Sequence, residues 1–243
     1  MYKGRTVSLV LPAYNEEESI VRVIQEFKKT WLLDEVIIVD NNCKDNTVKL
    51  ARGVKNVKIV KERKQGYGYA LQRGLAVSKS KIIVTCDADN TYTPRDIKKL
   101  LSKSESFDFV FASRVNKKYI LPGARMGFVR RWANILISKL IQFGFKGPKL
   151  TDLGATFRLL NRNGYEKIKD HLSVGGIHFQ PELTILALRN GLKVVEVPVH
   201  YGPRKGISKI SGSLWGGIRT ARKMVGIILY YYLMSKSEFL KNL

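Results

Sequence analysis

Three short apolar runs dominate the first third of the chain, and each one ends at acidic or amide side chains. The runs are rich in Val and Ile and cover residues 6–11, 35–39 and 81–86. Runs of this length and composition predict strands that are buried on both faces. Helices are predicted between and after them, at residues 17–29, 45–51 and 69–78. This alternation indicates an α/β fold, a mainly parallel sheet flanked by helices.

The third run leads into two carboxylates, Asp87 and Asp89, separated only by Ala88. The period of two along a strand places both carboxylates on the same side of its exit. Like charges at that spacing repel each other unless a cation lies beside them. Hard divalent cations such as Mg²⁺ bind carboxylate oxygens together with substrate phosphates. The other interpretation is a strand-end Asp pair that caps a turn and the following helix.

The other two runs also deliver polar residues at their carboxyl ends. The first leads into Pro12, Tyr14 and Glu16, and the second ends at Asp40. Open α/β sheets bind ligands at the carboxyl ends of their strands, so these segments are expected to meet at one site. Gly66 allows close approach of backbone to a ligand, which by itself is a weak signal for phosphate binding.

Taken in order, these motifs resemble family 2 glycosyltransferases, which have the GT-A fold and use nucleotide-diphospho-sugars. The motifs that carry this resemblance are residues 12–16, 39–45, 66–70 and 87–89. The later segments resemble dolichol-phosphate mannose synthases and related polyprenyl-phosphate hexosyltransferases, on residues 113–114, 151–152, 157–158, 196–199 and 204–209. Two departures, Asn42-Cys43 in place of Gly-Ser and Ile207 in place of an acidic residue, leave the preferred donor and acceptor open.

The resemblance implies a metal-dependent, inverting transfer of a hexose from GDP-mannose or UDP-glucose to a polyprenyl (dolichyl) phosphate. The cation, Mg²⁺ or Mn²⁺, would be held by Asp87, Asp89 and Thr91. The nucleotide sugar would be bound by Pro12, Tyr14, Glu16, Asp40, Gly66, Asp87, Ala88 and Asp89. The acceptor phosphate would be bound by Arg114, Arg130, Arg131, Arg204 and Lys209. The residues expected to be catalytic are Asp87, Asp89, Arg204 and Lys209.

A lipid phosphate acceptor makes a simple demand on the protein. The second pKa of a phosphate monoester is about 6, so the group is already ionised at neutral pH. Such an acceptor needs cationic side chains to position it, and arginine matches phosphate with two parallel hydrogen bonds. The three histidines are scattered along the chain and do not form a base–nucleophile or zinc pattern.

The formal net charge of +23 is unevenly distributed along the chain. No acidic residue occurs between Asp108 and Asp152, and Glu238 is the only one after His200. The acidic residues therefore concentrate in the first half, where a metal would be held. The basic second half suits an anionic acceptor or an anionic membrane surface.

Two apolar segments within the basic half, at residues 130–143 and 219–233, carry Arg or Lys at their start. No apolar run reaches eighteen residues, so amphipathic helices lying at a membrane interface are expected rather than a span. Ordinary helices packed on the sheet or in a dimer are the alternative. We therefore expect a catalytic domain at residues 1–212 and a membrane-apposed helix at 213–243.

The expected location is the cytoplasm, with peripheral attachment to the cytoplasmic face of a membrane. The first residues show no signal peptide pattern, and two cysteines favour a reducing compartment over a disulfide framework.

Other functions are compatible with parts of the sequence. Another family 2 enzyme could act on a glycan or a small acceptor, although the Gln-x-x-Arg-Trp motif of processive enzymes has Phe128 in place of Gln. A sugar nucleotidyltransferase would have a glycine-rich opening in place of residues 12–16. A basic nucleic-acid-binding protein fits the charge, but three acidic strand ends would repel a phosphate backbone. Nucleic acid is therefore not an expected partner.

Overall fold

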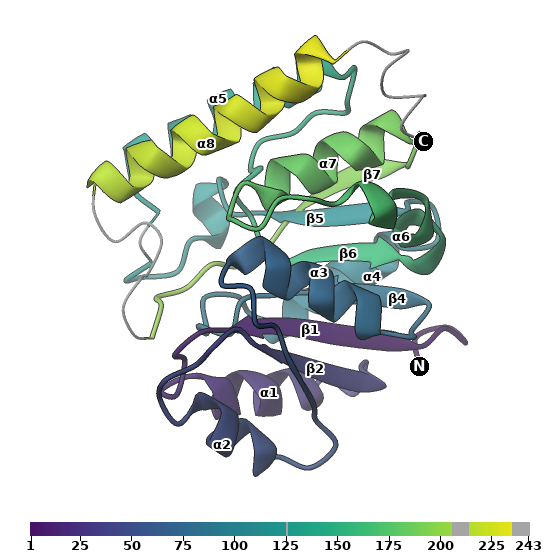
Figure 1. Ribbon diagram of the computed structural model, residues 1–243, viewed down its shortest axis with the longest axis vertical. Helices are drawn as coiled ribbons and strands as arrows, with labels where there is room; N and C mark the ends of the chain where they lie inside the picture. Colours follow the sequence, from purple (N-terminus) through teal and green to yellow (C-terminus); the bar gives the residue numbers. More distant parts are fainter. Residues whose placement is uncertain (125, 206–213, 235–243) are drawn as a thin grey trace.

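The computed structural model describes residues 1–124, 126–205 and 214–234. A seven-stranded sheet runs through the molecule (Figure 1). Its strands are β1 (Val7–Ala13), β2 (Glu35–Asp40), β3 (Lys58–Lys61), β4 (Ile82–Thr85), β5 (Phe109–Ser113), β6 (Arg158–Asn161) and β7 (Val194–Pro198). They lie in the order β3-β2-β1-β4-β6-β5-β7, and β6 alone pairs antiparallel with its neighbours. The expected mainly parallel α/β sheet is confirmed.

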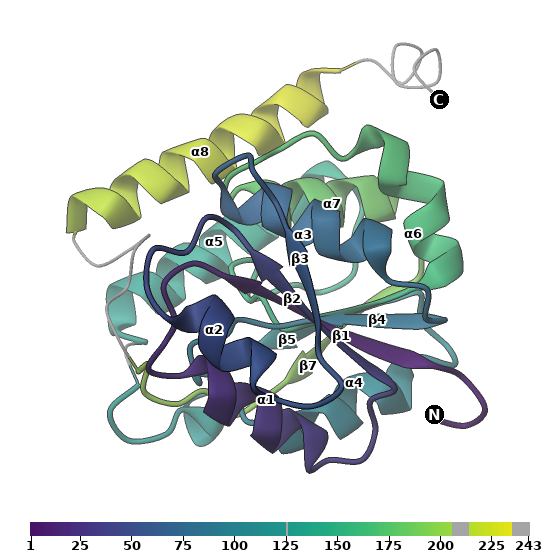
Figure 2. The ribbon, with the colours of Figure 1, turned by 60° about the horizontal axis from the view of Figure 1, so that its bottom comes forward.

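Helices cover both faces of the sheet (Figures 1 and 2). One face packs against α1 (Ile20–Lys28), α2 (Thr47–Arg52) and α4 (Ile97–Lys103). The other packs against α3 (Tyr67–Val77), α5 (Phe128–Gly144), α6 (Arg162–Ile168) and α7 (Phe179–Arg189), and α8 (Leu214–Leu233) packs on α5 and α7. The sequence of β1 is continuously apolar because both of its faces are buried: Leu9 and Leu11 pack in the core on one face of the sheet, and Val10 packs in the core on the other. Short 3₁₀ turns occur at Pro94–Asp96, Lys117–Tyr119 and Lys169–His171.

The loops that follow β1, β2 and β4 share a sharp turn made by an asparagine. Asn15, Asn42 and Asn90 have φ values of 54°, 65° and 66°. Asparagine tolerates this left-handed conformation better than most residues, because its short amide bonds to nearby backbone. In the first loop, the side-chain oxygen of Asn15 accepts a hydrogen bond from the Lys44 amide at 2.7 Å. These turns redirect the chain at the edge of the sheet where the strand-end carboxylates lie.

The first helix begins later than its acidic start predicts. Residues 16–18 precede α1 instead of forming its first turn, and the helix begins at Ile20. The Glu16 amide donates to the Thr47 hydroxyl at 2.7 Å, and the Glu17 carboxylate accepts from the Asn46 amide at 2.9 Å. These long-range partners hold the acidic residues in the loop, where Glu16 can face the site.

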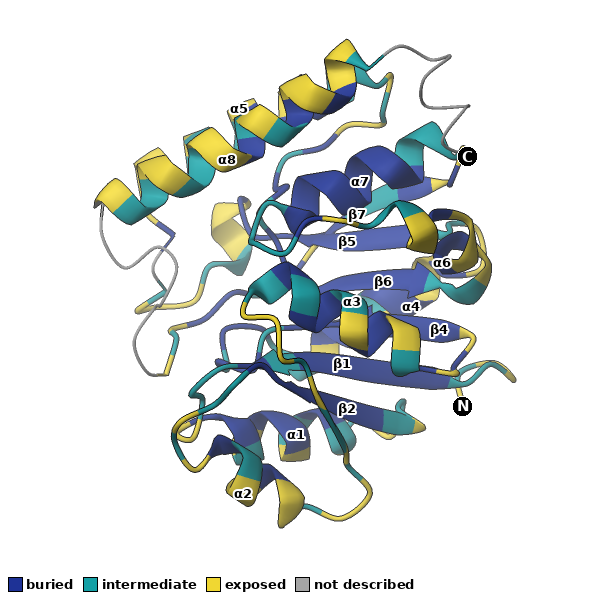
Figure 3. Cartoon of the chain, in the orientation of Figure 1, coloured by how far each residue is buried: buried dark blue, intermediate teal, exposed yellow. Residues whose placement is uncertain are grey.

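Helices α5 and α8 pack together, and each has both buried and exposed residues (Figure 3). On α8, Met224, Ile228 and Tyr231 are buried in the second core. The exposed apolar face of these helices is formed by Phe128, Trp132, Leu136, Leu140 and Phe143 of α5 with Trp215, Ile218, Leu229, Tyr232 and Leu233 of α8. In the part of the chain that the structure describes, no helix meets the length and hydropathy of a membrane span. The boundary at residue 213 falls outside the described residues and stays a prediction.

Candidate active site

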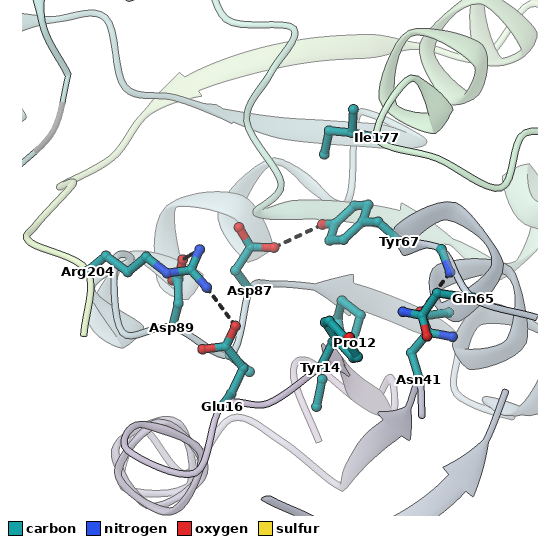
Figure 4. A pocket seen from close by; sticks show the side chains of 14 residues that line it. Pro12, Tyr14, Glu16, Asn41, Gln65, Tyr67, Asp87, Asp89, Ile177 and Arg204 are labelled. Atoms are coloured by element: carbon teal, nitrogen blue, oxygen red, sulfur yellow. Dashed lines mark hydrogen bonds and ion pairs between the residues drawn. The ribbon is translucent and has the colours of Figure 1, made fainter. Parts of the chain in front are cut away.

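A pocket of about 270 Å³ opens at the carboxyl ends of β1, β2 and β4 (Figure 4). Parallel strands bring their loops together at this edge, as expected for an open α/β sheet. The pocket is lined by Pro12, Ala13, Tyr14, Glu16, Asn41, Gln65, Gly66, Tyr67, Ala70, Asp87, Ala88, Asp89, Ile177 and Arg204. Segments from both halves of the sequence therefore form its wall.

Asp87 and Asp89 lie side by side in the pocket but have different neighbours. The Tyr67 hydroxyl donates to Asp87 Oδ1 at 3.0 Å. Asp89 Oδ1 accepts from the Thr91 amide at 3.0 Å and from the Thr91 hydroxyl at 2.6 Å. Burial raises the pKa of Asp87 to about 6, and the adjacent Asp89 carboxylate adds to that rise. A cation placed between these groups would relieve the repulsion.

Arg204 supplies a positive charge at this position. Its Nη2 lies 2.6 Å from Glu16 Oε1, and its Nη1 lies 3.0 Å from Asp89 Oδ2 (Figure 4). The chain that carries it is fastened to the Asp89 loop, because the Gly202 amide donates to the Thr91 carbonyl at 2.8 Å. One guanidinium group therefore bridges the loops that follow β1 and β4.

The carboxylate oxygens in the pocket fit a divalent cation that also binds a diphosphate. Within the described residues, no group of three or more His, Cys, Asp or Glu side chains is arranged to enclose a metal by itself. Mg²⁺ is commonly bound by one or two carboxylates together with substrate phosphates. Asp87 and Asp89 supply those carboxylates, and the bridging guanidinium shows that the site accommodates positive charge.

Most of the residues expected to bind nucleotide sugar reach the pocket. They are Pro12, Tyr14, Glu16, Gly66, Asp87, Ala88 and Asp89. Asp40 is placed differently, because its carboxylate accepts from the Cys43 amide at 2.8 Å and its neighbour Asn41 lines the pocket. Thr91 lies behind Asp89 and donates to it, which orients that carboxylate.

The expected acceptor-binding cations are placed at different distances from the pocket. Arg204 lines it, whereas Lys209 lies outside the described residues. Arg114 is almost fully buried and pairs with both oxygens of Asp152, at 2.8 and 2.9 Å. Its guanidinium lies 5.1 Å from the centre of the Tyr201 ring, three residues before Arg204.

Arg130 and Arg131 lie in the first turn of α5. Burial raises the pKa of the Tyr201 phenol, and the positive charges of Arg114 and Arg130 oppose that rise. Arg114 and Arg130 therefore both act electrostatically on the segment that carries Arg204.

Six further pocket residues were not expected from the sequence: Ala13, Asn41, Gln65, Tyr67, Ala70 and Ile177. Asn41 holds the rim, since its side-chain oxygen accepts from the Gly66 amide at 2.9 Å. Tyr67 lies between Gly66 and Gly68 of the motif at residues 66–70, and this position could have indicated that it lines the pocket. Ile177 reaches the pocket only through tertiary packing, so local sequence carried no signal for it.

Comparisons with known proteins agree on one family. Residues 8–169, more than half of the chain, match the family described as glycosyl transferase family 2. An uncharacterized glycosyltransferase of Mycobacterium tuberculosis is 30% identical over 230 residues, covering 88% of this chain and 94% of the relative. The dolichyl-phosphate hexose transferase of Haloferax volcanii is 27% identical over 231 residues, covering 94% and 96%.

A solved structure has the same fold. It is glucosyl-3-phosphoglycerate synthase from Mycobacterium tuberculosis in complex with Mn²⁺, uridine diphosphate and glucosyl-3-phosphoglycerate. The TM-score is 0.71 at 21% identity, with 96% of this chain and 82% of that chain covered. The sheet, the pocket at its carboxyl edge and the matching family model lead to one conclusion: the chain belongs to glycosyltransferase family 2 and has the GT-A fold.

Proposed function

We propose that this enzyme transfers a hexose from a nucleotide-diphospho-sugar to a polyprenyl phosphate, with a divalent cation and with inversion at the sugar. The observation that carries the proposal is the bridge from Arg204 to Glu16 and Asp89. The carboxylates at one end of this bridge suit a metal diphosphate. The Arg204 guanidinium at the other end suits the phosphate of an acceptor. The Haloferax volcanii relative, named a dolichyl-phosphate hexose transferase, supports the choice of acceptor.

The donor would lie along the loops after β1, β2 and β4. Pro12, Tyr14 and Asn41 line the pocket, and in this arrangement they would face the base and ribose. Asp87 and Asp89 would hold Mg²⁺ or Mn²⁺ against the diphosphate. When bound, the cation stabilises the negative charge that grows on the leaving group.

The acceptor would approach from the side that carries Arg204. An ionised phosphate is already nucleophilic, so the protein has to position it in line with the sugar. Arg204 is the first residue proposed for this role, and Arg114, Arg130, Arg131 and Lys209 are the others. When the metal diphosphate replaces Arg204 at Asp89, the freed guanidinium is available for the acceptor phosphate. Donor binding before acceptor binding is the expected order.

The exposed apolar face of α5 and α8 would meet the membrane that holds the lipid. Exposed cations accompany it, at Arg130, Lys139, Arg219, Arg222 and Lys223. Aromatic residues with basic neighbours favour the interface of an anionic leaflet. Each basic residue near such a surface contributes about 1 kcal/mol of attraction. This arrangement supports our proposal that the enzyme attaches peripherally to the cytoplasmic face of a membrane.

The decisive experiment offers nucleotide sugars with a short polyprenyl phosphate and either Mg²⁺ or Mn²⁺. GDP-mannose, UDP-glucose and UDP-N-acetylglucosamine are the first donors to compare, and mass spectrometry detects lipid-linked sugar. We expect a lipid-linked product with one of these donors and none after EDTA treatment. A parallel reaction with 3-phosphoglycerate tests a soluble phosphate acceptor. Transfer to 3-phosphoglycerate alone would contradict the lipid proposal and leave a different family 2 activity.

A further inference from the structure

Glu182 of α7 is a buried carboxylate that the proposed chemistry does not use. Its side chain is fully buried, and it accepts hydrogen bonds from the Ser173 hydroxyl at 2.7 Å and the Val174 amide at 3.0 Å. The Tyr231 hydroxyl of α8 donates to the same carboxylate at 3.3 Å. A second connection joins the same helices, because Arg189 donates to the backbone carbonyl of Tyr231. Glu182 therefore links α8 to the segment that precedes α7.

That segment, residues 173–177, lies against the start of α3. The Gly175 carbonyl accepts from the Gly68 amide at 2.7 Å, and the Val174 carbonyl accepts from the Gln72 side chain at 3.0 Å. The backbones are so close that a Cβ atom on Gly68 would lie 2.1 Å from the Val174 oxygen. A displacement of residues 173–177 toward α3 would therefore push its start, and a displacement away from it would break these hydrogen bonds.

The start of α3 and residues 173–177 are parts of the donor pocket. Gly66, Tyr67 and Ile177 line it, and Tyr67 holds Asp87 through the hydrogen bond described above. Helix α7 supplies another support, since the buried side chain of Gln180 donates to the Tyr67 hydroxyl at 3.4 Å. Hydrogen bonds and adjacent residues thus connect Tyr231 on α8 to Asp87 in the site. Figure 4 shows the last of these hydrogen bonds, from Tyr67 to Asp87.

We propose that Glu182 is a positioning residue which, together with Tyr231, ties α8 to the wall of the donor pocket. Seating of α8 and binding of the donor then stabilise each other, because coupling between two sites is reciprocal. Within the proposed function, the helix assigned to the membrane surface also supports the nucleotide site. An enzyme seated on its membrane would hold its donor more tightly than the same enzyme in solution.

The test compares Tyr231→Phe with Tyr230→Phe in the full chain. Both variants lose one hydroxyl from the same helix, but Tyr230 is exposed, with 57% of its surface open to solvent. Calorimetry with UDP and with GDP, each with Mn²⁺, measures nucleotide affinity at a temperature well below unfolding. We expect Tyr231→Phe to weaken binding about three- to tenfold, equivalent to roughly 0.7–1.4 kcal/mol, and Tyr230→Phe to leave it unchanged.

Hydrogen exchange gives a second measurement that does not depend on a bound nucleotide. In Tyr231→Phe, the amides of Ser173, Val174 and Gly68 should exchange faster than in the parent. Glu182→Gln should show the same effects more strongly, because an amide replaces one acceptor oxygen with a donor. If that variant fails to fold, Tyr231→Phe decides the question alone.

Unchanged nucleotide affinity and unchanged exchange at residues 173–174 in Tyr231→Phe would overturn the positioning role. A variant that only loses thermal stability, with native affinity at low temperature, would overturn it as well. If neither nucleotide binds the parent protein, the proposed donor site is wrong. Hydrogen exchange then tests the connection from α8 to α3 by itself. Faster exchange at both residues 173–174 and Gly68 would still support the connection from α8 to α3, and unchanged exchange would overturn it.

Discussion

At the scale of single residues, three contacts converge on the Asp89 carboxylate. Thr91 donates twice to one of its oxygens and Arg204 contacts the other. Asp89→Asn keeps the shape but removes the charge that would hold the cation against the diphosphate. We expect transfer to fall at least about 100-fold, a loss of roughly 2.7 kcal/mol in transition-state stabilisation. Steady-state assays of the variant measure this loss.

Asp170→Asn is the matched control for this change, because Asp170 is exposed on the surface away from the pocket. It should retain the parent activity. Full activity of Asp89→Asn, or of the parent protein in excess EDTA, would show that the assignment of the cation site is wrong.

Arg204 and Lys205 provide a pair of neighbouring cations with different surroundings. Arg204 bridges two carboxylates, whereas Lys205 is exposed. Arg204→Ala should lower transfer to lipid phosphate at least about tenfold, since a hydrogen bond to a charged group contributes about 1.5–3 kcal/mol. Binding of nucleoside diphosphate with Mn²⁺ should be unchanged or tighter, because the guanidinium no longer competes for Asp89.

Lys205→Ala removes the same charge from the same segment and should leave both quantities close to the parent values. Calorimetry and product formation separate the two effects. Loss of nucleotide binding together with transfer in Arg204→Ala would mean that Arg204 grips the diphosphate, and the acceptor clamp would then be sought at Arg114 and Arg130.

Cys43 gives a residue-level prediction about pH. Burial raises the pKa of its thiol to about 11, and the Sγ donates to the Ala13 carbonyl at 3.3 Å. A group whose pKa is raised on folding contributes stability below its ordinary pKa, and that contribution is lost as the pH rises toward 11. At pH 8, alkylation of Cys43 by iodoacetamide should be roughly a hundredfold slower than in the unfolded chain, because little thiolate is present. Site-resolved mass spectrometry measures the rates, and equal rates would contradict this view.

At the scale of helices and strands, the sequence predicted what local pattern controls. The β-branched runs are β1, β2 and β4 in the structure. A strand that is buried on both faces is continuously apolar, so its position can be recognised from the sequence alone. The predicted start of α1 was wrong, because Glu16 and Glu17 form hydrogen bonds with residues that are distant in the sequence.

The candidate site divides in the same way. Asp87, Asp89 and Glu16 come soon after their strands, and all three line the pocket. Their predicted roles in binding the nucleotide sugar and the cation stay predictions. Ile177 and the Glu182–Tyr231 contact depend on how α7 and α8 pack, which no local motif encodes. Lys209 stays a prediction, because it lies outside the described residues.

The helices α5 and α8 can be tested with the three tryptophans of the chain. Trp132 and Trp215 lie on these helices, and Trp31 follows α1, a helix near the opposite end of the molecule (Figure 1). All three are exposed, at 53%, 79% and 88%. Variants that retain a single tryptophan should show a blue shift of emission on anionic vesicles for Trp132 and Trp215, as their indoles enter the interface. Trp31 should show none. Equal behaviour of all three would remove the support for a membrane-facing surface.

At the scale of the whole molecule, acidic and basic residues lie in different parts of the fold. The loops after β1 and β4 bring Glu16, Asp87 and Asp89 to the pocket, while basic residues gather on α5 and α8. A divalent cation and a diphosphate need the first environment, and a lipid phosphate in an anionic leaflet needs the second. Arg204 lies where the two meet.

This division predicts that membrane attachment depends on where positive charge lies rather than on its total. Arg219, Arg222 and Lys223 are exposed on α8, and Lys49, Arg52 and Lys55 are exposed on or just after α2. Helix α2 lies at the opposite end of the molecule from α8 (Figure 1). Changing the first three to Gln should weaken binding to anionic vesicles about 100-fold at low salt, since each basic residue contributes about 1 kcal/mol near such a surface. The same change at the second three lowers the net charge equally and should have little effect. Co-sedimentation at increasing salt measures both, and the difference should shrink as the Debye length falls below about 10 Å. Equal losses in the two triple variants would mean that the whole positive charge attracts the vesicle and that α8 has no special place at the membrane.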